Sequence, residues 1–149
     1  MSPMEESAVS LADVTFSYRG AGVPSLSSLS LDVAAGECVL LCGKSGCGKS
    51  TVLRLLNGMI PEFYDGEASG KVEVAGMDPA SCPQYEIARS VGTVFQNPRT
   101  QFYTLNTTSE VAFGCENQGL ERAEIVRRVG NAAEELGIES LMNRSIFQL

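Results

Sequence analysis

Alternating apolar and polar side chains predict the first elements of this 149-residue chain. From Ala8 to Tyr18 apolar positions interleave with polar ones, which predicts a strand of an antiparallel sheet with one buried face. Residues 26–33 alternate less strictly and predict a second strand, and residues 71–76 predict a short third strand closed by glycine. The glycines and the proline between residues 19 and 24 predict a turn.

Two further apolar runs do not alternate. Residues 37–42 and 91–95 are short and mostly apolar, which is typical of strands that are buried on both faces. The first run is expected to lie in a parallel sheet, with Cys38 and Cys42 buried in it as small hydrophobes. The second run is another candidate buried strand and ends at Gln96.

Helical patterns predict four helices. Residues 52–58 favour a helix that stops at Gly58, and residues 84–90 favour a short one. Ser109 is expected to cap a third helix. The longest helix is predicted over residues 121–136. Gly137 is expected to end this helix. Its apolar face comprises Ile125, Val129, Ala132, Ala133 and Leu136.

Between the first buried run and the first helix lies a glycine-rich loop. It fits the phosphate-binding pattern, a glycine and four residues followed by Gly-Lys-Ser. The glycines let successive backbone N–H groups converge on phosphate oxygens, and the helix N-terminus adds positive potential. Lys49 supplies charge for the β- and γ-phosphates, Ser50 is the expected Mg²⁺ ligand, and Thr51 serves the α-phosphate side. The predicted nucleotide-binding residues are Gly43, Lys44, Ser45, Gly46, Cys47, Gly48, Lys49, Ser50 and Thr51. The alternative is a Gly/Ser-rich turn with a chance lysine, which the strand–loop–helix context disfavours.

Charge and composition exclude several kinds of protein. The formal net charge is −7, from 11 basic and 18 acidic residues, which argues against nonspecific binding to nucleic acid. The chain contains no histidine, so catalysis or metal binding by histidine is excluded within it. Five cysteines with no zinc spacing favour reduced thiols, although Cys47 in the loop is a candidate for modification. No apolar run is long enough to span a membrane, so membrane association is expected only through a partner.

The loop, Tyr18 and residues 94–98 together resemble the ATPase subunit of ATP-binding cassette (ABC) transporters, over residues 8–149. This resemblance implies an α/β fold: a P-loop NTPase core, here a partial parallel sheet flanked by helices, with an N-terminal antiparallel β subdomain and the start of a helical subdomain. It divides the chain into an ATP-binding core and β subdomain over 8–96 and a helical part from 97 to 149.

A narrower resemblance rests on residues 56–64, 95–102 and 110–117. These stretches look most like the ATPases of energy-coupling factor importers, which take up vitamins and transition-metal ions. The resemblance implies ATP and Mg²⁺ as cofactors, membrane-embedded transporter subunits and a second ATPase subunit or cassette as partners, and no nucleic acid. It also implies a peripheral location on the cytoplasmic face of the cell membrane.

The family pattern implies roles for two residues outside the loop. Tyr18 matches an aromatic ring that stacks on adenine, which suits any base because every base has a π-face. The alternative for Tyr18 is a strand tyrosine that covers the edge of the core. Gln96 matches a glutamine that reaches Mg²⁺ and the attacking water, so Lys49 and Gln96 are the expected catalytic residues and Ser50 and Gln96 the expected metal ligands. The alternative for Gln96 is a loop glutamine.

Residues 97–117 resemble the region of the family that faces the membrane subunit. Four side chains there are candidates for a docking surface, and packing within the helical subdomain is the favoured alternative for at least two of them. They are Arg99, Phe102, Tyr103 and Phe113.

Three family features do not occur in the sequence: the Gly-rich signature, a strand ending in Asp-Glu, and the histidine switch. We expect an N-terminal fragment that stops just before the signature, and negligible ATP hydrolysis by residues 1–149 alone. The alternatives to an importer are a soluble ABC-type ATPase that acts on nucleic acid or the ribosome, and a nucleotide-binding module without turnover.

Overall fold

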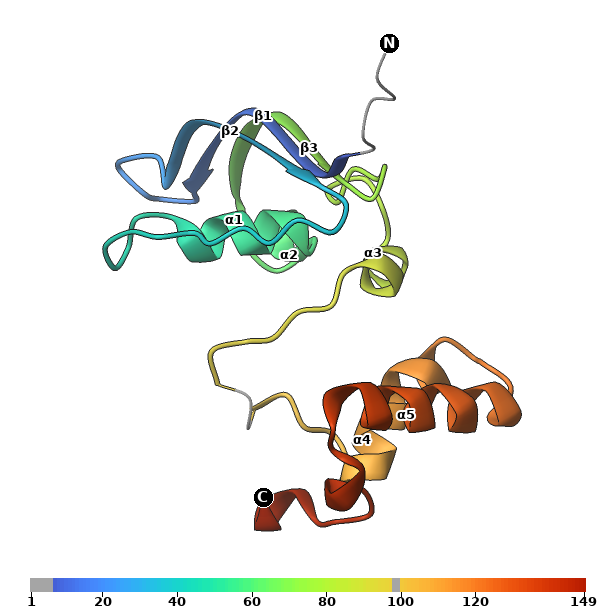
Figure 1. The fold of residues 1–149 in the computed structure, drawn as a ribbon. Helices are drawn as coiled ribbons and strands as arrows, with labels where there is room; N and C mark the ends of the chain where they lie inside the picture. Colours follow the sequence, from blue (N-terminus) through green and yellow to red (C-terminus); the bar gives the residue numbers. More distant parts are fainter. Residues whose placement is uncertain (1–6, 98–99) are drawn as a thin grey trace. The chain divides into compact units, whose positions relative to one another are not determined.

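The computed structural model describes residues 7–97 and 100–149. The chain forms two compact units, Met1–Thr93 and Val94–Leu149. The first unit contains the sheet and the helices packed on it, and the second is helical (Figure 1).

The sheet of the first unit has three antiparallel strands in the order β2-β1-β3. They are β1 (Ser7–Tyr18), β2 (Leu26–Ala34) and β3 (Gly66–Val74). The first two strands confirm the predictions from alternation. The third begins five residues earlier than predicted, because backbone pairing with β1 extends to Gly66, which lies opposite Tyr18. Backbone hydrogen bonds need no apolar side chains, so the glycine-rich start of β3 carries no alternation signal.

A β-bulge in β1 explains why its buried residues are unevenly spaced. Leu11, Val14 and Phe16 are all buried, although a regular strand would turn Leu11 and Val14 to opposite faces. The pairing register shifts between Leu11 and Val14, and Asp13 at the bulge has a φ of 51°. Opposite it, Gly70 passes so close that a Cβ there would lie 2.4 Å from the Asp13 carbonyl oxygen.

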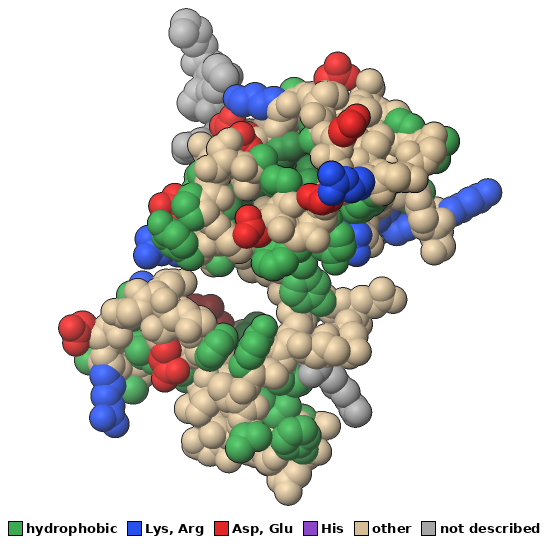
Figure 2. Space-filling model, turned by 180° about the vertical axis from the view of Figure 1, so that it is seen from behind, with side chains coloured by type: hydrophobic (Ala, Val, Ile, Leu, Met, Phe, Trp, Pro, Cys, Tyr) green, Lys and Arg blue, Asp and Glu red, His purple; other side chains and the backbone are tan. Residues whose placement is uncertain are grey.

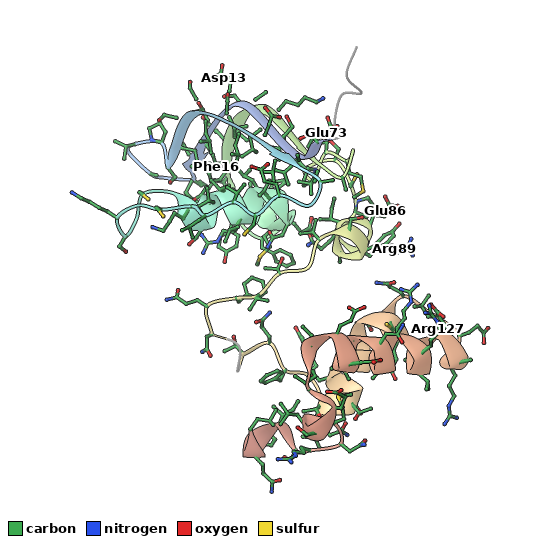
Figure 3. The ribbon with its side chains drawn as sticks, viewed as in Figure 1. Asp13, Phe16, Glu73, Glu86, Arg89 and Arg127 are labelled. Carbon is green, nitrogen blue, oxygen red and sulfur yellow. The ribbon has the colours of Figure 1, made fainter. Side chains whose placement is uncertain are left out.

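One face of the sheet is covered by α1 (Lys49–Leu56) and α2 (Met59–Glu62) (Figure 1). Phe16 lies between the sheet and α1 (Figure 3) and is fully buried, and burial of such a side chain stabilises the fold by about 1.5–3 kcal/mol. The predicted stop at Gly58 is confirmed, since this residue has a left-handed φ of 73° just after α1. The buried core comprises Leu11, Val14, Phe16, Leu26, Val52, Leu55 and Ile60.

The predicted parallel strands are wrong for the described residues. Neither 37–42 nor 91–95 is a strand, and Leu40 and Val94 expose 83% and 88% of their surface. Cys38 and Cys42 are exposed as well, against the prediction. A strand forms only by pairing with a neighbouring strand, and within 7–97 and 100–149 the paired strands are β1, β2 and β3, all antiparallel.

The predicted helix over 84–90 is confirmed as α3 (Gln84–Ser90), in the first unit. The second unit pairs α4 (Thr107–Asn117) with α5 (Arg122–Leu136). Short 3₁₀ turns follow at Glu139–Leu141 and Ile146–Gln148.

Two details of the second unit differ from the predictions. Asn106, and not Ser109, caps α4: the Asn106 Oδ1 accepts a hydrogen bond of 2.9 Å from the backbone N–H of Ser109. Helix α5 ends at Gly137 as predicted, with Val129 and Ala133 buried, but Leu136 is 71% exposed. Its position on the apolar face is not covered by a neighbouring element among the described residues.

Candidate phosphate-binding site

The glycine-rich loop ends on the N-terminus of α1, and two of its glycines have left-handed backbones. Gly46 has a φ of 80° and Gly48 a φ of 95°, conformations that L side chains rarely adopt. At Gly48 a Cβ would lie 2.6 Å from the Ser25 carbonyl oxygen and 2.7 Å from Leu26 Cδ2. Glycine at this position lets the loop pass directly against the start of β2.

The N-terminus of α1 is suited to an anion. The first backbone N–H groups of a helix have no acceptor within the helix, and the N-cap residue Gly48 has no side chain to supply one. The first turn contains no acidic residue that would neutralise the positive end of the helix dipole. Backbone donors and dipole therefore favour a phosphate group at this end of α1.

The Lys49 ammonium lies over the loop. Its Nζ donates hydrogen bonds of 2.8 Å to the carbonyl oxygens of Gly43 and Lys44, and it lies 3.5 Å from Cys47 Sγ. An ammonium has three donors, and the contact with sulfur is the weakest of the three. A phosphate oxygen could replace this contact while both carbonyls keep Lys49 in place.

A hollow of about 310 Å³ lies at the N-terminus of α1. At Gly46 an added Cβ would meet nothing within 4 Å. None of the residues that line the hollow is acidic, and two of them are cationic, so the donor set fits a chain of phosphates. The lining residues are Tyr18, Ser25, Gly46, Gly48, Lys49, Ser50, Thr51 and Arg54.

Tyr18 lines this hollow from the end of β1, and stacking of its ring on adenine stays a prediction. Its hydroxyl lies 3.1 Å from Thr51 Oγ1, and its ring packs edge-on with Phe16 at 4.8 Å and with Tyr64 at 6.3 Å between centroids. Tyr18 also lines a second hollow of about 320 Å³, together with the exposed ion pair of Arg19 and Asp65.

Arg54 also belongs to the site, although the motif does not include it. Its Nη1 donates a hydrogen bond of 2.8 Å to the Tyr18 hydroxyl, and its Cζ lies 4.1 Å from the centroid of the Tyr64 ring. Residues three apart on a helix share a face, so Thr51 and Arg54 project together. That spacing was the available signal that Arg54 faces the same space as the phosphate loop.

The remaining predicted residues are distributed over both units. Lys44, Ser45 and Cys47 are exposed on the loop, and Ser50 is exposed in the first turn of α1. Gln96 belongs to the second unit, where its side chain is exposed. Shared binding of Mg²⁺ by Ser50 and Gln96 stays a prediction.

The aromatic residues of the second unit partly pack on one another. The rings of Tyr103 and Phe113 stack at 5.1 Å between centroids, yet Tyr103 is 78% exposed and Phe102 is exposed as well. Exposed apolar side chains are visible on both units (Figure 2). Arg99 lies outside the described residues, so a docking surface with these four residues stays a prediction.

A glycine-rich loop, a lysine over it and an unneutralised helix N-terminus are the features of a phosphate-binding loop. Comparison with known families gives the particular class. The family model for the ABC transporter matches residues 26–149, and the chain belongs to this family through its ATP-binding domain. Each helix in the part of the chain that the structure describes is too short or too polar to cross a bilayer.

Several similar proteins are named "Putative ABC transporter ATP-binding protein". One from Treponema denticola is 47% identical over 141 residues, which are 95% of this chain and 29% of the relative. One from Methanosarcina acetivorans is 42% identical and one from Saccharolobus solfataricus 41%, again over 95% of this chain, with 23% and 27% of the relative covered. The chain thus spans about a quarter of the length of these relatives.

Proposed function

We propose that this chain forms part of the ATP-binding subunit of an importer of the energy-coupling factor class. The observation that carries the nucleotide-binding part is the acid-free hollow at the N-terminus of α1, where Lys49 lies over the loop. Membership of the ABC transporter family supports ATP with Mg²⁺ as the ligand. The importer class rests on the resemblance of residues 56–64, 95–102 and 110–117.

In this proposal each residue has a distinct task. Lys49 balances the charge of the β- and γ-phosphates, the loop N–H groups orient them, and the Tyr18 ring stacks on adenine. Ser50 and Gln96 hold the metal ion, since hydroxyl and amide oxygens are neutral ligands that suit a hard cation. Bound Mg²⁺ would neutralise charge on the phosphates.

The proposed partners follow the family. The subunit works on the cytoplasmic face of the membrane with membrane-embedded subunits and a second ATPase subunit or cassette, and the imported nutrient is a vitamin or metal ion. Residues 8–96 provide the nucleotide-binding core and residues 97–149 the start of the helical subdomain. Within the latter, the exposed Phe102 and Tyr103 are proposed to dock on the membrane subunit, while Phe113 packs on Tyr103.

Equilibrium binding of ATP to Lys49→Ala tests the nucleotide site. Loss of a charged hydrogen bond of about 1.5–3 kcal/mol raises the Kd for ATP by about tenfold or more. Lys71→Ala is the matched control, because Lys71 is an exposed lysine on β3 that pairs with Glu73 at 2.6 Å, and it should bind as the wild type does. Equal affinity of the wild type and Lys49→Ala would contradict the proposal.

The importer class is tested by copurification from the native organism. A hydrophobic membrane subunit in the complex supports it. Copurified RNA without a membrane subunit would instead indicate an ABC-type ATPase that acts on nucleic acid, and would contradict the importer assignment.

A further inference from the structure

We infer that Arg54 is a positioning residue that holds the Tyr18 ring in place for the nucleotide base. This inference rests on the proposed function, because it assumes that Tyr18 contacts the base. It goes beyond that function because it gives a role to a residue outside the phosphate-binding motif.

The contacts of Arg54 lead from α1 to the strand that carries Tyr18. The guanidinium donates its 2.8 Å hydrogen bond to the Tyr18 hydroxyl and lies over the Tyr64 ring at 4.1 Å. Arg54 is half-buried, so the charge-assisted hydrogen bond and the cation–π contact are shielded from water in part. A guanidinium held by two aromatic residues is a rigid support for one of them.

The Tyr18 hydroxyl has a second partner on the same helix, Thr51, at 3.1 Å. Thr51 and Arg54 therefore connect α1, whose first residue is Lys49, with the hydroxyl of Tyr18. Removal of Arg54 would leave Thr51 as the polar anchor of that hydroxyl on α1, and the ring could rotate away from the orientation that stacks on a base. Affinity for the base would fall while the phosphate loop stays intact.

Arg54 also lines the hollow, so direct contact with a bound phosphate is the competing explanation. The two explanations differ in one observable. A positioning role through Tyr18 affects ligands that have a base, whereas a phosphate contact affects every polyphosphate equally.

The test compares ATP with inorganic tripolyphosphate, which carries the phosphates without a base. Calorimetric binding to the wild-type chain, Arg54→Met and Arg54→Lys gives both Kd values. We expect Arg54→Met to raise the Kd for ATP about fivefold, the factor for one hydrogen bond of about 1 kcal/mol, and to leave tripolyphosphate unchanged. Arg54→Lys, which keeps a cation over the Tyr64 ring, should recover part of the loss. Arg89→Met is the matched control, since Arg89 lies 5.8 Å from the Tyr85 ring on α3 (Figure 3) and should leave both Kd values unchanged.

A double-mutant cycle with Tyr18→Phe shows whether Arg54 affects ATP binding through the Tyr18 hydroxyl. Phenylalanine keeps the ring and removes the hydroxyl that Arg54 holds, so Arg54→Met should weaken ATP binding no further in the Tyr18→Phe background. Urea unfolding confirms that each variant is folded, and Arg54→Lys with the same two ligands decides the matter if Arg54→Met does not fold.

The outcomes separate this inference from the proposed function. A wild-type chain that binds neither ATP nor tripolyphosphate would overturn the proposed function and this inference with it. Binding of ATP by the wild type with an unchanged Kd in Arg54→Met would overturn the inference alone. Equal losses for ATP and tripolyphosphate, or additive losses in the cycle, would also overturn it.

Discussion

At the scale of single residues, Gly48 is constrained both by its backbone conformation and by its close contacts. Its φ of 95° starts α1 from a left-handed N-cap, and its missing side chain leaves room for the Ser25 carbonyl and the Leu26 side chain. The phosphate loop is thus packed against the start of β2, at a position where a side chain would overlap with Ser25 and Leu26. Consequences for stability and for binding should therefore appear together when this residue is changed.

The substitution Gly48→Ala tests this packing. The left-handed backbone costs about 1–3 kcal/mol with a Cβ, and the overlap with Ser25 and Leu26 adds a further 1–3 kcal/mol of strain. Urea unfolding should show the two losses together as a lower urea concentration at the midpoint of unfolding. Gly76→Ala is the control in the same unit, since Gly76 has a φ of 75° but nothing within 4 Å of an added Cβ, and it should lose the backbone part only. Equal losses in the two variants would show that the contact with β2 does not constrain Gly48.

The site residues differ in how well the sequence predicts them. Lys49, Ser50 and Thr51 occur in a motif of fixed spacing, so their place at the N-terminus of α1 could be predicted from the sequence. The spacing of Arg54 from Thr51 indicates its face of the helix, but its role could not be predicted, because that role depends on contacts with Tyr18, 36 positions away, and with Tyr64. Only the tertiary structure brings these three side chains together.

At the scale of elements, α5 stabilises its first turn by a cluster of charges. Glu124 accepts hydrogen bonds from Arg127 at 2.7 Å and from Arg128 at 2.6 Å (Figure 3 labels Arg127). The hydrogen bond from Arg127, followed by that from Arg128, lowers the pKa of Glu124 from 4.5 to about 2. An acidic residue near the helix N-terminus with basic residues three and four positions later is a favourable order.

The depressed pKa predicts a pH dependence for α5. Since the folded pKa is below the unfolded one, the carboxylate of Glu124 contributes stability above about pH 4.5, and this contribution is lost as the pH falls toward 2. NMR titration of the Glu124 carboxyl group in the folded chain should give a value near 2. Arg127→Gln should move the pKa toward 4.5, whereas Arg122→Gln, on the same helix, should shift it much less. A titration near 4.5 in the wild type would contradict the arrangement.

Elements are predicted well where a pattern has one physical cause. Alternation in β1 and β2 and the glycine stop of α5 each reflect local geometry, and the structure has them at the predicted places. The apolar run over 37–42 is ambiguous, because burial of such a run depends on neighbouring strands that its own residues do not specify. The same holds for residues 91–95. The early start of β3 could not be predicted, because it depends on backbone hydrogen bonds to β1 and not on a side-chain pattern.

At the scale of the whole molecule, the nucleotide site is mainly a property of the first unit. Tyr18, the loop, α1 and Arg54 all belong to Met1–Thr93, whereas α4 and α5 belong to Val94–Leu149. Each unit has its own buried residues, Phe16 and Ile60 among those of the first and Val129 and Ala133 in the second. Separate cores allow the units to open independently, with different free energies.

Hydrogen exchange with ATP tests this independence. A ligand at about 100 times its Kd stabilises the binding-competent state by about 2.7 kcal/mol, and amides that exchange only when the site opens are protected by that amount. Protection should rise at residues 49–56 of α1 and stay unchanged at residues 122–136 of α5, because opening of α5 leaves the loop, Lys49 and Tyr18 in place. At the same ATP concentration Lys49→Ala, with its Kd raised about tenfold, should show about half of this protection at α1 and none at α5. Equal gains at α1 and α5 would mean that the chain opens as one cooperative unit, so that Lys49 and the second unit would share a single unfolding transition.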